Sequence, residues 1–451
     1  MGVHRPSWVL EALDRLTQAG YVTCLVGGCV RDALLGIEPY DYDLASSALP
    51  EQVKACFPGH DFVTAGEKHG TVGVVFDGKV LEITTFRSDG TYSDRRHPDQ
   101  VQFITDVEED LARRDFTVNA MAQTPDGTLL DPFDGRTDLK RRLIRCVGDP
   151  ERRFREDALR IFRALRFASQ LGFNIHPDTE AAMRACAPLL TEIAPERLQR
   201  ELTKMLLYAG AERVILRYTD ILGVVLPELP PMKGFDQCNG YHAYDVLSHT
   251  TRTVAEIPPD PILRLAALFH DVGKPDCFTV DENGVGHFYG HPDRSAEMAL
   301  ERLTALRFDQ KTISHVCRLI RDHDKYIDIT EAAVRKRLSE MGPELFEELY
   351  LLQRADNLAS GTCPPERLDP IDELALLRDQ VMTRGDCFCR RDLAVDGDDL
   401  MRLGLMPGPV MGMILDRLLD EVMEDSLPNE KSVLLRQAMA LQAELSGKQE
   451  N

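Results

Sequence analysis

The hydrophobic pattern changes near residue 149, and this change constrains the fold more than any other feature of the chain. Between residues 21 and 145, short apolar runs alternate with turns, and their Val, Ile, Thr and Phe content predicts strands: YVTCLVGG, TVGVVF, KVLEITTF and VQFIT. Helical patterns lie around these runs, at 7–19, 29–35 and 107–122. From residue 149 onward the pattern is almost wholly helical. The sequence therefore predicts an α+β protein with an α/β head followed by an all-helical body.

Local signals divide the helical body into segments. Asp149 followed by Pro150 is a favourable helix start, since Asp caps the first free N–H groups and Pro fits the first helical position. An apolar stripe at helical spacing follows, formed by Ala158, Ile161, Phe162, Leu165 and Ala168. Pro-rich stretches predict boundaries at 227–231, 258–261 and 363–370.

The overall charge argues, at first sight, against a nucleic-acid partner. The chain has 451 residues and a formal net charge of −21. Residues 136–166, however, hold ten Arg and Lys140 against five acidic residues, a balance of 11 − 5 = +6, so the remainder carries −21 − 6 = −27. Phosphate binding requires clustered cations, and this segment supplies them locally.

The chain has the composition of a cytoplasmic protein. No apolar run approaches the roughly 18–20 residues that span a bilayer, so we expect no membrane association. The eleven Cys are scattered singly apart from Cys387 and Cys389, which is typical of reduced thiols. The C-F-C spacing matches no common zinc site.

Two short motifs in the head suggest a nucleotide site. Gly27 and Gly28 join a predicted strand to a helix that carries Arg31 in its first turn, a place where a phosphate can approach the backbone. Many strands are joined to helices by such a turn, so this motif alone is weak. Asp41 and Asp43 are two residues apart in an extended segment and point to the same face, where they can hold Mg²⁺. A solvated acidic turn is the alternative for this pair.

Further polar residues can join that site. Glu82 lies within a predicted strand and is either a third carboxylate near the metal or a structural residue. Arg113 and Arg114 precede an Asn in a predicted helix, and guanidinium groups bind phosphate in a bidentate manner. Four charged residues recur every three positions along the next helix, where they either contact a base and a triphosphate or form an ion-pair ladder: Asp157, Arg160, Arg163 and Arg166.

The motifs in the head and in the basic segment are far more specific together than any one of them is alone. GGCVRD, DYD, RRDFTVNA and EDALRIFRALRF follow one another over about 140 residues, and this order resembles the class II tRNA nucleotidyltransferases and bacterial poly(A) polymerases, a branch of the polymerase β-like nucleotidyltransferase superfamily. DPFDGRTDL at 131–139 and LAVDGDDLMRLGLMPGPVMGMIL at 393–415 extend the resemblance over nearly the whole chain.

The resemblance implies template-independent addition of CCA to tRNA 3′ ends from CTP and ATP. Asp41 and Asp43 would be the catalytic residues that hold two Mg²⁺. The nucleotide would be bound by residues of the other motifs: Gly28 and Arg31 at the triphosphate, Arg114 with its neighbour Arg113, Asp157 and Arg160 at the base edge, and Arg163 and Arg166 beside them. Residues 87–100 resemble the flexible loop that moves between C and A addition.

Other activities share parts of this pattern. A poly(A) polymerase or an A-only tRNA nucleotidyltransferase carries the same motifs, but the chain lacks the basic extensions often found in the poly(A) polymerases of this branch. A phosphohydrolase with a merely nucleotide-binding head is a second alternative. A non-catalytic RNA-binding protein would be expected to lack Asp41 and Asp43, and both are present.

Histidine and aspartate residues in the helical body form a second constellation. Five of the twelve His fall between residues 242 and 291, and His270-Asp271 ends an apolar helix. More distant candidates lie on other predicted helices: His249, His291, His323 and Asp356. Imidazole with carboxylate suits Ni²⁺, Mn²⁺, Fe²⁺ or Zn²⁺. The alternative is a degenerate site retained for packing.

This constellation resembles the HD phosphohydrolase domain that is fused to some bacterial members of the same family. The resemblance implies His249, His270, Asp271 and Asp356 as core metal ligands, with His291 and His323 extending the site toward a second metal. The substrate would be a 2′,3′-cyclic phosphate or a phosphomonoester. We therefore expect four domains: a nucleotidyltransferase head at 1–148, a helical neck at 149–230, an HD domain at 231–360 and a tRNA-binding helical tail at 361–451.

Overall fold

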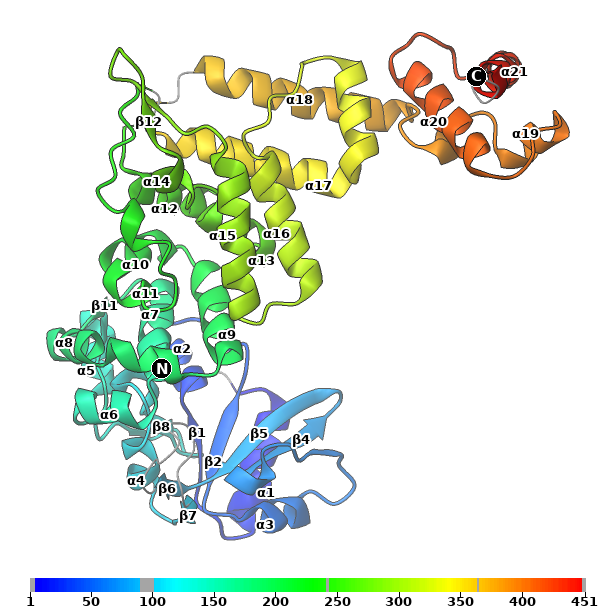
Figure 1. The fold of residues 1–451 in the computed structure, drawn as a ribbon. Helices are drawn as coiled ribbons and strands as arrows, with labels where there is room; N and C mark the ends of the chain where they lie inside the picture. Colours follow the sequence, from blue (N-terminus) through cyan, green and yellow to red (C-terminus); the bar gives the residue numbers. More distant parts are fainter. Residues whose placement is uncertain (1–4, 90–100, 241–242, 363–364, 448–451) are drawn as a thin grey trace. The chain divides into compact units, whose positions relative to one another are not determined.

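The protein has the mixed α+β fold that the sequence predicts, with strands in the head and helices in the body. The computed structural model describes residues 5–89, 101–240, 243–362 and 365–447 (Figure 1). The chain forms two compact units, Met1–Pro230 and Pro231–Asn451, which divide within the predicted break at 227–231. Within the described residues, every helix is too short or too polar to span a bilayer.

The first unit is built on a seven-stranded sheet with the order β3-β4-β5-β2-β1-β8-β9. Strand β2 pairs in parallel with β5, and the other neighbours are antiparallel. Leu25, Leu44, Leu81 and Ile83 are fully buried in the sheet, which explains the apolar runs that predicted these strands. The strands of the sheet are β1 (Thr23–Val26), β2 (Asp43–Ser46), β3 (Phe62–Val63), β4 (Thr71–Phe76), β5 (Lys79–Thr85), β8 (Ala122–Gln123) and β9 (Leu129–Leu130).

Helices and short ribbons complete the first unit. Helices α1 (Ser7–Gln18), α2 (Gly28–Leu34) and α3 (Pro50–Cys56) contact the sheet (Figure 1). Two small ribbons are formed by β6 (Arg87–Asp89) with β7 (Val101–Phe103), and by β10 (Leu143–Ile144) with β11 (Asn174–Ile175). The remaining helices are α4 (Val107–Ala112), α5 (Gly135–Arg141), α6 (Pro150–Glu156), α7 (Leu159–Leu171), α8 (Pro177–Cys186), α9 (Pro195–Leu206), α10 (Ala211–Arg217) and α11 (Thr219–Leu222).

The helix start predicted at Asp149 is confirmed. Its side chain accepts a hydrogen bond from the backbone N–H of Arg152 (2.7 Å), and Pro150 is the first residue of α6. The predicted stripe on α7 is buried from Ala158 to Ala168.

The helix predicted over 107–122 is wrong beyond Ala112. Helix α4 ends there, and only a short 3-10 turn follows at Thr117–Asn119. The cause is local competition by polar side chains: Asp115 accepts from the backbone N–H of Phe116 (2.8 Å), and the Thr117 hydroxyl donates to Asp138 (2.7 Å). These bonds stabilise an irregular backbone that places the side chains of this segment in the site.

The second unit is almost wholly helical. The break predicted at 258–261 is confirmed between two helices, whereas the part of 363–370 that is described belongs to a helix whose early turns contain Pro365 and Pro370. The elements of this unit are α12 (Val246–Glu256), α13 (Pro261–Phe269), α14 (Lys274–Cys277), β12 (Thr279–Val280), β13 (Gly286–His287), α15 (His291–Ala305), α16 (Gln310–Asp322), α17 (Glu331–Ala359), α18 (Pro365–Arg384), α19 (Gly397–Arg402), α20 (Pro409–Met423) and α21 (Lys431–Gly447).

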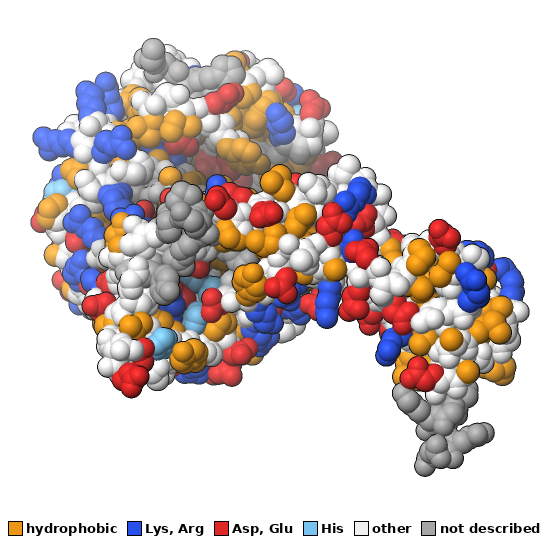
Figure 2. Space-filling model, turned by 90° about the horizontal axis from the view of Figure 1, so that it is seen from above, with side chains coloured by type: hydrophobic (Ala, Val, Ile, Leu, Met, Phe, Trp, Pro, Cys, Tyr) orange, Lys and Arg blue, Asp and Glu red, His pale blue; other side chains and the backbone are white. Residues whose placement is uncertain are grey.

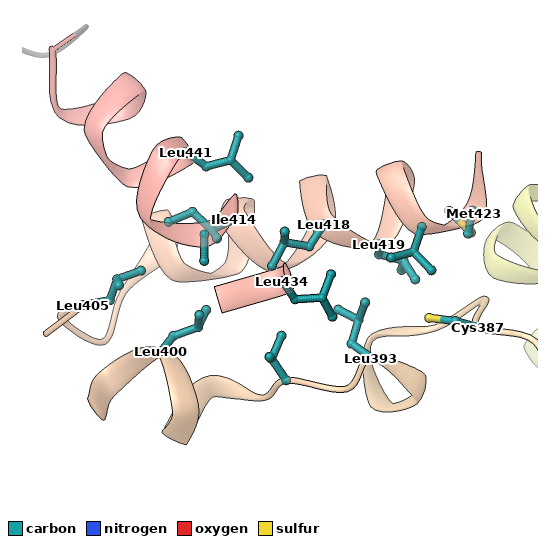
Figure 3. Close-up of a cluster of buried hydrophobic side chains, with 13 residues drawn as sticks. Cys387, Leu393, Leu400, Leu405, Ile414, Leu418, Leu419, Met423, Leu434 and Leu441 are labelled. Carbon is teal, nitrogen blue, oxygen red and sulfur yellow. The ribbon is translucent and has the colours of Figure 1, made fainter. Parts of the chain in front are cut away.

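A separate hydrophobic cluster stabilises the C-terminal helices. Leu400 of α19, Ile414 and Leu418 of α20 and Leu434 of α21 are fully buried against one another (Figure 3). Burial of a Leu or Ile side chain contributes about 1.5–3 kcal/mol, so these contacts hold the last three helices together.

Acidic side chains do not form one continuous surface on the face drawn in Figure 2. Asp and Glu are interspersed there with Lys, Arg and apolar side chains. The net charge of −21 is therefore a poor description of this face.

Candidate active site

The first unit contains a cavity of about 620 Å³ that is lined mainly by charged side chains. The lining includes Gly27, Gly28, Arg31, Asp43, Glu82, Arg113, Arg114, Asp115, Asn119, Asp157, Arg160, Arg163, Arg166, Phe167, Gln170 and Arg197. The structure thus brings together residues of the head motifs and of the basic segment, which are distant in the sequence, whereas the exposed Asp41 is not among the residues that line the cavity.

Carboxylates line one part of the cavity. Asp43 is the first residue of β2 and is in register with Glu82 on the parallel strand β5. Burial, together with the neighbouring carboxylates of Glu82 and the exposed Asp41, raises the pKa of Asp43 to about 6 against the opposing effect of Arg114. Glu82, for which the sequence left two interpretations, lies beside Asp43 in the cavity. Crowded carboxylates of this kind fit a divalent cation, which removes their repulsion.

The turn between β1 and α2 requires glycine. Gly27 has a φ of +75°, and a Cβ at this position would lie 3.0 Å from Nη1 of Arg114. Arg31 is more buried than the sequence suggests: it is 4% exposed, donates to Oδ1 of Asn119 (2.8 Å) and pairs with Asp32 (2.7 Å). The guanidinium group of Arg31 is therefore fixed before any ligand binds.

Asp110 positions the paired arginines. This carboxylate is fully buried, and it accepts hydrogen bonds from Nη2 of Arg113 (2.7 Å) and from Nη2 of Arg114 (3.3 Å). Charge-assisted bonds of this kind are stronger than neutral ones. Both guanidinium groups are consequently held in the cavity wall.

Asp157 does not lie on the same helix as the arginines that follow it. It occupies an extended position (φ −149°, ψ 102°) between α6 and α7, so the predicted four-residue helical stripe is wrong at its first member. The reason is a local cap, since its carboxylate accepts from the backbone N–H of Leu159 (3.1 Å). Arg160 donates to Glu156 (2.9 Å) and to the carbonyl oxygen of Arg113 (3.3 Å), which leaves it 9% exposed.

Arg163 and Arg166 are engaged in internal ion pairs. Nε and Nη2 of Arg163 contact Oδ2 of Asp115 at 2.8 and 2.7 Å, and Nε of Arg166 donates to Glu201 at 2.5 Å. With Arg31 they also surround the ring of Phe167, at 5.4 Å for Arg163, 4.0 Å for Arg166 and 5.2 Å for Arg31. Both arginines therefore form ion pairs, but with carboxylates of other elements and not in a ladder along α7, and each still lines the cavity.

Several residues of the site were not predicted. Asp110, Asn119, Phe167, Arg197 and Glu201 contact the predicted arginines or Asp157. Asn119 and Phe167 lie inside the motifs RRDFTVNA and EDALRIFRALRF, which are the signals that pointed to them, whereas Asp110 precedes the first of these motifs. Arg197 and Glu201 come from α9, and their place depends on how α9 packs against α7.

The second unit brings the predicted histidines and aspartates together. The ligand atoms of His249, His270, Asp271 and Asp356 lie within 4.8 Å of one another, as do those of Asp271, His291 and His323. Five helices supply them: α12, the end of α13, the start of α15, the end of α16, and α17. All are buried except Asp356, which is partly exposed.

Backbone contacts orient three of these imidazoles. Nδ1 lies near the carbonyl oxygen three residues earlier in His270 (2.8 Å), His291 (2.9 Å) and His323 (2.6 Å). A proton on Nδ1 directed at a carbonyl leaves Nε2 as the acceptor atom, which is the tautomer that binds metals. The three Nε2 atoms are the atoms that face the cluster: those of His270 and His291 approach Asp271 at 3.3 Å, and that of His323 lies 3.3 Å from that of His291.

The charges within the cluster are unevenly distributed. Complete burial alone would lower the pKa of His270, but Asp271 and Asp356 raise it to about 10. Burial and the neighbouring His270 lower the pKa of His323 to about 3. In the protein without a metal, the carboxylates of Asp271 and Asp356 are therefore faced by a protonated His270 and by the buried ammonium of Lys274, which lies 2.7 Å from Oδ2 of Asp271. A divalent cation would take the place of the proton on Nε2 of His270.

Three stretches of the chain match models of known protein families. Residues 23–145 match the poly A polymerase head domain, residues 172–232 match a probable RNA and SrmB-binding site of polymerase A, and residues 293–438 match a putative tRNA nucleotidyltransferase domain 2. The sheet, the carboxylates on β2 and β5 and the arginine-lined cavity define a nucleotidyltransferase with a head of the poly(A) polymerase type.

Full-length relatives specify the family. The chain is 36% identical over 440 residues to a CCA-adding enzyme of Levilactobacillus brevis, covering 94% of this chain and 95% of the relative. It is 32% identical to the crystal structure of the Bacillus stearothermophilus CCA-adding enzyme in complex with CTP, with a TM-score of 0.71 over 97% of this chain and 98% of that chain. The chain belongs to the CCA-adding enzyme family. The Thermotoga maritima CCA-adding enzyme complexed with tRNA_CCA, at 21% identity and a TM-score of 0.59, shares the fold over 97% of this chain and 96% of that chain.

Proposed function

We propose that the protein adds C, C and A to tRNA 3′ ends from CTP and ATP. The observation that carries this proposal is a single cavity that contains both the carboxylates of β2 and β5 and the Asp157 carboxylate beside α7. Similarity over nearly the whole chain to CCA-adding enzymes, one of them solved with CTP, supports it.

Asp41 and Asp43, assisted by Glu82, are the residues that would hold Mg²⁺. When bound, Mg²⁺ makes the primer hydroxyl more acidic and neutralises charge on the triphosphate. Arg31 and Arg114 bind and orient the phosphates, because their guanidinium groups are already fixed by Asn119 and Asp110.

Asp157 and Arg160 select the base in this proposal. Cytosine and adenine each carry an amino group beside a ring nitrogen that accepts a hydrogen bond, whereas uracil and guanine present a carbonyl beside an N–H. A carboxylate accepts from the amino group and a guanidinium donates to the ring nitrogen, so C and A are bound and U and G are rejected. Arg163 and Arg166 stabilise this wall from behind through Asp115 and Glu201.

The test is extension of a tRNA that ends at the discriminator base, with Mg²⁺ and each nucleotide separately and together. We expect C, C and A to be added and the reaction to stop. Addition of A alone, and only to tRNA ending in CC, would indicate an A-only enzyme, and long A tails would indicate a poly(A) polymerase. Asp43→Asn should abolish transfer.

A second activity is favoured by the buried His and Asp cluster of the second unit. We propose that His249, His270, Asp271 and Asp356 hold a transition metal such as Ni²⁺, Mn²⁺ or Fe²⁺, and that His291 and His323 extend the site. The Nδ1 contacts that leave Nε2 as the acceptor in His270, His291 and His323 support this proposal. Such a metal would activate water for attack on a phosphate ester.

Metal content and hydrolysis test this second activity separately from transfer. We expect the protein reconstituted with Ni²⁺ or Mn²⁺ to retain metal after gel filtration and to hydrolyse a 2′,3′-cyclic nucleotide or p-nitrophenyl phosphate. His270→Ala should lose both properties and keep nucleotide transfer. The matched control is His315→Ala, because His315 belongs to the same unit but pairs with Glu348 outside the cluster. Equal metal loss in both variants would contradict the proposal.

We further propose a division of labour along the chain, with a catalytic head at 1–148, a base-selecting neck at 149–230, an HD domain at 231–360 and a tRNA-binding tail at 361–451. The matches at 23–145 and 172–232 support the first two segments. The match at 293–438 extends across residue 360, so the support for the last two segments is the histidine cluster and the separate hydrophobic cluster of α19, α20 and α21.

A further inference from the structure

Arg197 of α9 forms a bidentate ion pair with the Asp157 carboxylate, and both residues line the cavity. Nη2 of Arg197 donates to Oδ2 of Asp157 at 2.7 Å, and Nη1 donates to Oδ1 at 3.2 Å. Both side chains are mostly buried, with 20% and 15% of their surface exposed. Arg197 is not among the buried residues of α9 that pack against the fold, and it lines the cavity instead. Its main contact is therefore with Asp157 itself.

The donors around Asp157 leave little acceptor capacity. A carboxylate has about four lone-pair positions. Oδ1 accepts from both Arg197 and the backbone N–H of Leu159 (3.1 Å), and Oδ2 accepts from Arg197. One acceptor position remains, on Oδ2, and Asp157 lines the cavity.

We infer that Arg197 is a positioning residue that sets nucleotide selectivity by fixing the orientation of the Asp157 carboxylate. The remaining lone pair accepts one N–H, which is what the exocyclic amino group of cytosine or adenine supplies. This inference rests on the proposed nucleotidyl transfer and adds a residue to its base-selecting wall.

The fixed orientation of the Asp157 carboxylate should affect the rejection of UTP and GTP more than the binding of CTP and ATP. A uracil or guanine carbonyl would face the Asp157 oxygen with its own lone pair, and neither group could donate. A carboxylate that is free to rotate can turn its oxygen away and so reduce this repulsion. A carboxylate held by bidentate hydrogen bonds from a guanidinium group cannot rotate in this way. Loss of Arg197 therefore relieves the penalty against U and G more than it weakens the binding of C and A.

The test is the ratio of kcat/KM values in the full-length protein with Mg²⁺. CTP and UTP are compared on tRNA ending at the discriminator base, and ATP and GTP on tRNA ending in CC. We expect Arg197→Met to lower both ratios about tenfold or more, because a site whose hydrogen-bonding group is no longer fixed loses its power to reject. The matched control is Arg200→Met, an exposed arginine of the same helix, which should leave both ratios unchanged.

A purely structural role predicts a different result. Arg197→Met would then slow all four nucleotides equally, and unchanged ratios would overturn the inference. Arg197→Lys keeps the charge but not the two-pronged geometry, so its ratios should fall below those of the wild type; wild-type ratios in this variant would also overturn it. If Arg197→Met shows no cooperative thermal transition, the Lys variant decides. A wild-type protein that adds no nucleotide would refute the proposed function itself.

Discussion

Removal of the Arg163 side chain should destabilise the first unit through the charge it leaves behind. Asp115 is 8% exposed, and Oδ2 accepts both contacts from Arg163, at 2.8 and 2.7 Å. Oδ1 keeps its bonds from the Phe116 N–H (2.8 Å) and from Asn119 (3.3 Å). In Arg163→Met the buried carboxylate therefore retains half of its partners and loses its main countercharge.

The expected loss is about 2–3 kcal/mol. Hydrogen bonds to charged groups contribute about 1.5–3 kcal/mol each, and breaking a fully buried ion pair costs about 3–5 kcal/mol. The Arg163 side chain is 34% exposed, and both of its bonds end on one oxygen of Asp115. The loss should therefore be smaller than that for a fully buried ion pair and close to that of one hydrogen bond to a charged group. For a unit of this size, that loss corresponds to a fall in Tm of about 5–10 °C.

Trp8 provides the assay for this prediction. It is the one tryptophan of the chain, it lies in α1 of the first unit, and it packs against Tyr42 and Phe76 at 5.7 and 6.2 Å between ring centroids. Urea unfolding followed by its fluorescence therefore reports the free energy of unfolding of the first unit.

Two further variants separate a buried charge from a general effect of losing arginine. Arg155→Met removes an exposed arginine paired with Glu151 and should cost less than about 0.5 kcal/mol. Asp115→Asn combined with Arg163→Met removes both charges and should recover at least half of the loss. A loss in Arg163→Met no larger than that of Arg155→Met, or a double variant whose losses simply add, would refute the reasoning.

Three other predictions concern separate parts of the first unit. Asp43→Asn should reduce nucleotide transfer at least about a thousandfold while Tm does not fall, because the variant removes one of the crowded carboxylates beside Glu82; this is checked by primer extension and thermal melting. Gly135→Ala should cost about 2–3 kcal/mol in Trp8 fluorescence unfolding, because its Cβ would collide with the carbonyl oxygen of Thr117. Burial opposes ionisation of Asp115, but Arg163 outweighs it and lowers the pKa of this carboxyl group. The free energy of unfolding that the wild type gains over Asp115→Asn should therefore be complete above about pH 4 and be lost as the pH falls through the lowered pKa. Urea unfolding of both proteins at several pH values measures this difference.

The sequence predicted those parts of the fold that depend on local pattern. The strands β4 and β5 and the capped start of α6 follow from alternation, β-branched residues and an Asp-Pro pair, all of which act within a few residues. The helix predicted through Arg113 and Arg114 was wrong, because polar side chains there bond to their own backbone and to distant elements. A hydrophobic period carries no information about such bonds.

The sequence predicted the cavity residues that belong to recognisable motifs, and it missed those that long-range packing brings into the cavity. Asp43 and the arginines belong to recognisable motifs, whereas the register between Asp43 and Glu82 depends on a parallel pairing of β2 with β5 that no local pattern reveals. Arg197 is separated from Asp157 by 40 residues, and its role depends on the packing of α9 against α7. The histidine and aspartate cluster was predicted from residue types and from the resemblance to the HD domain, and the structure adds the Nδ1 contacts that orient the rings.

The central claim is that one cavity selects and transfers C, C and A in a fixed order. Mass spectrometry of a tRNA ending at the discriminator base, after incubation with all four nucleoside triphosphates and Mg²⁺, tests this claim most directly. The account predicts one product that carries CCA and is not extended further, and no extension by Asp43→Asn. Products that contain U or G, products with long A tails, or a full CCA end made by Asp43→Asn would contradict it.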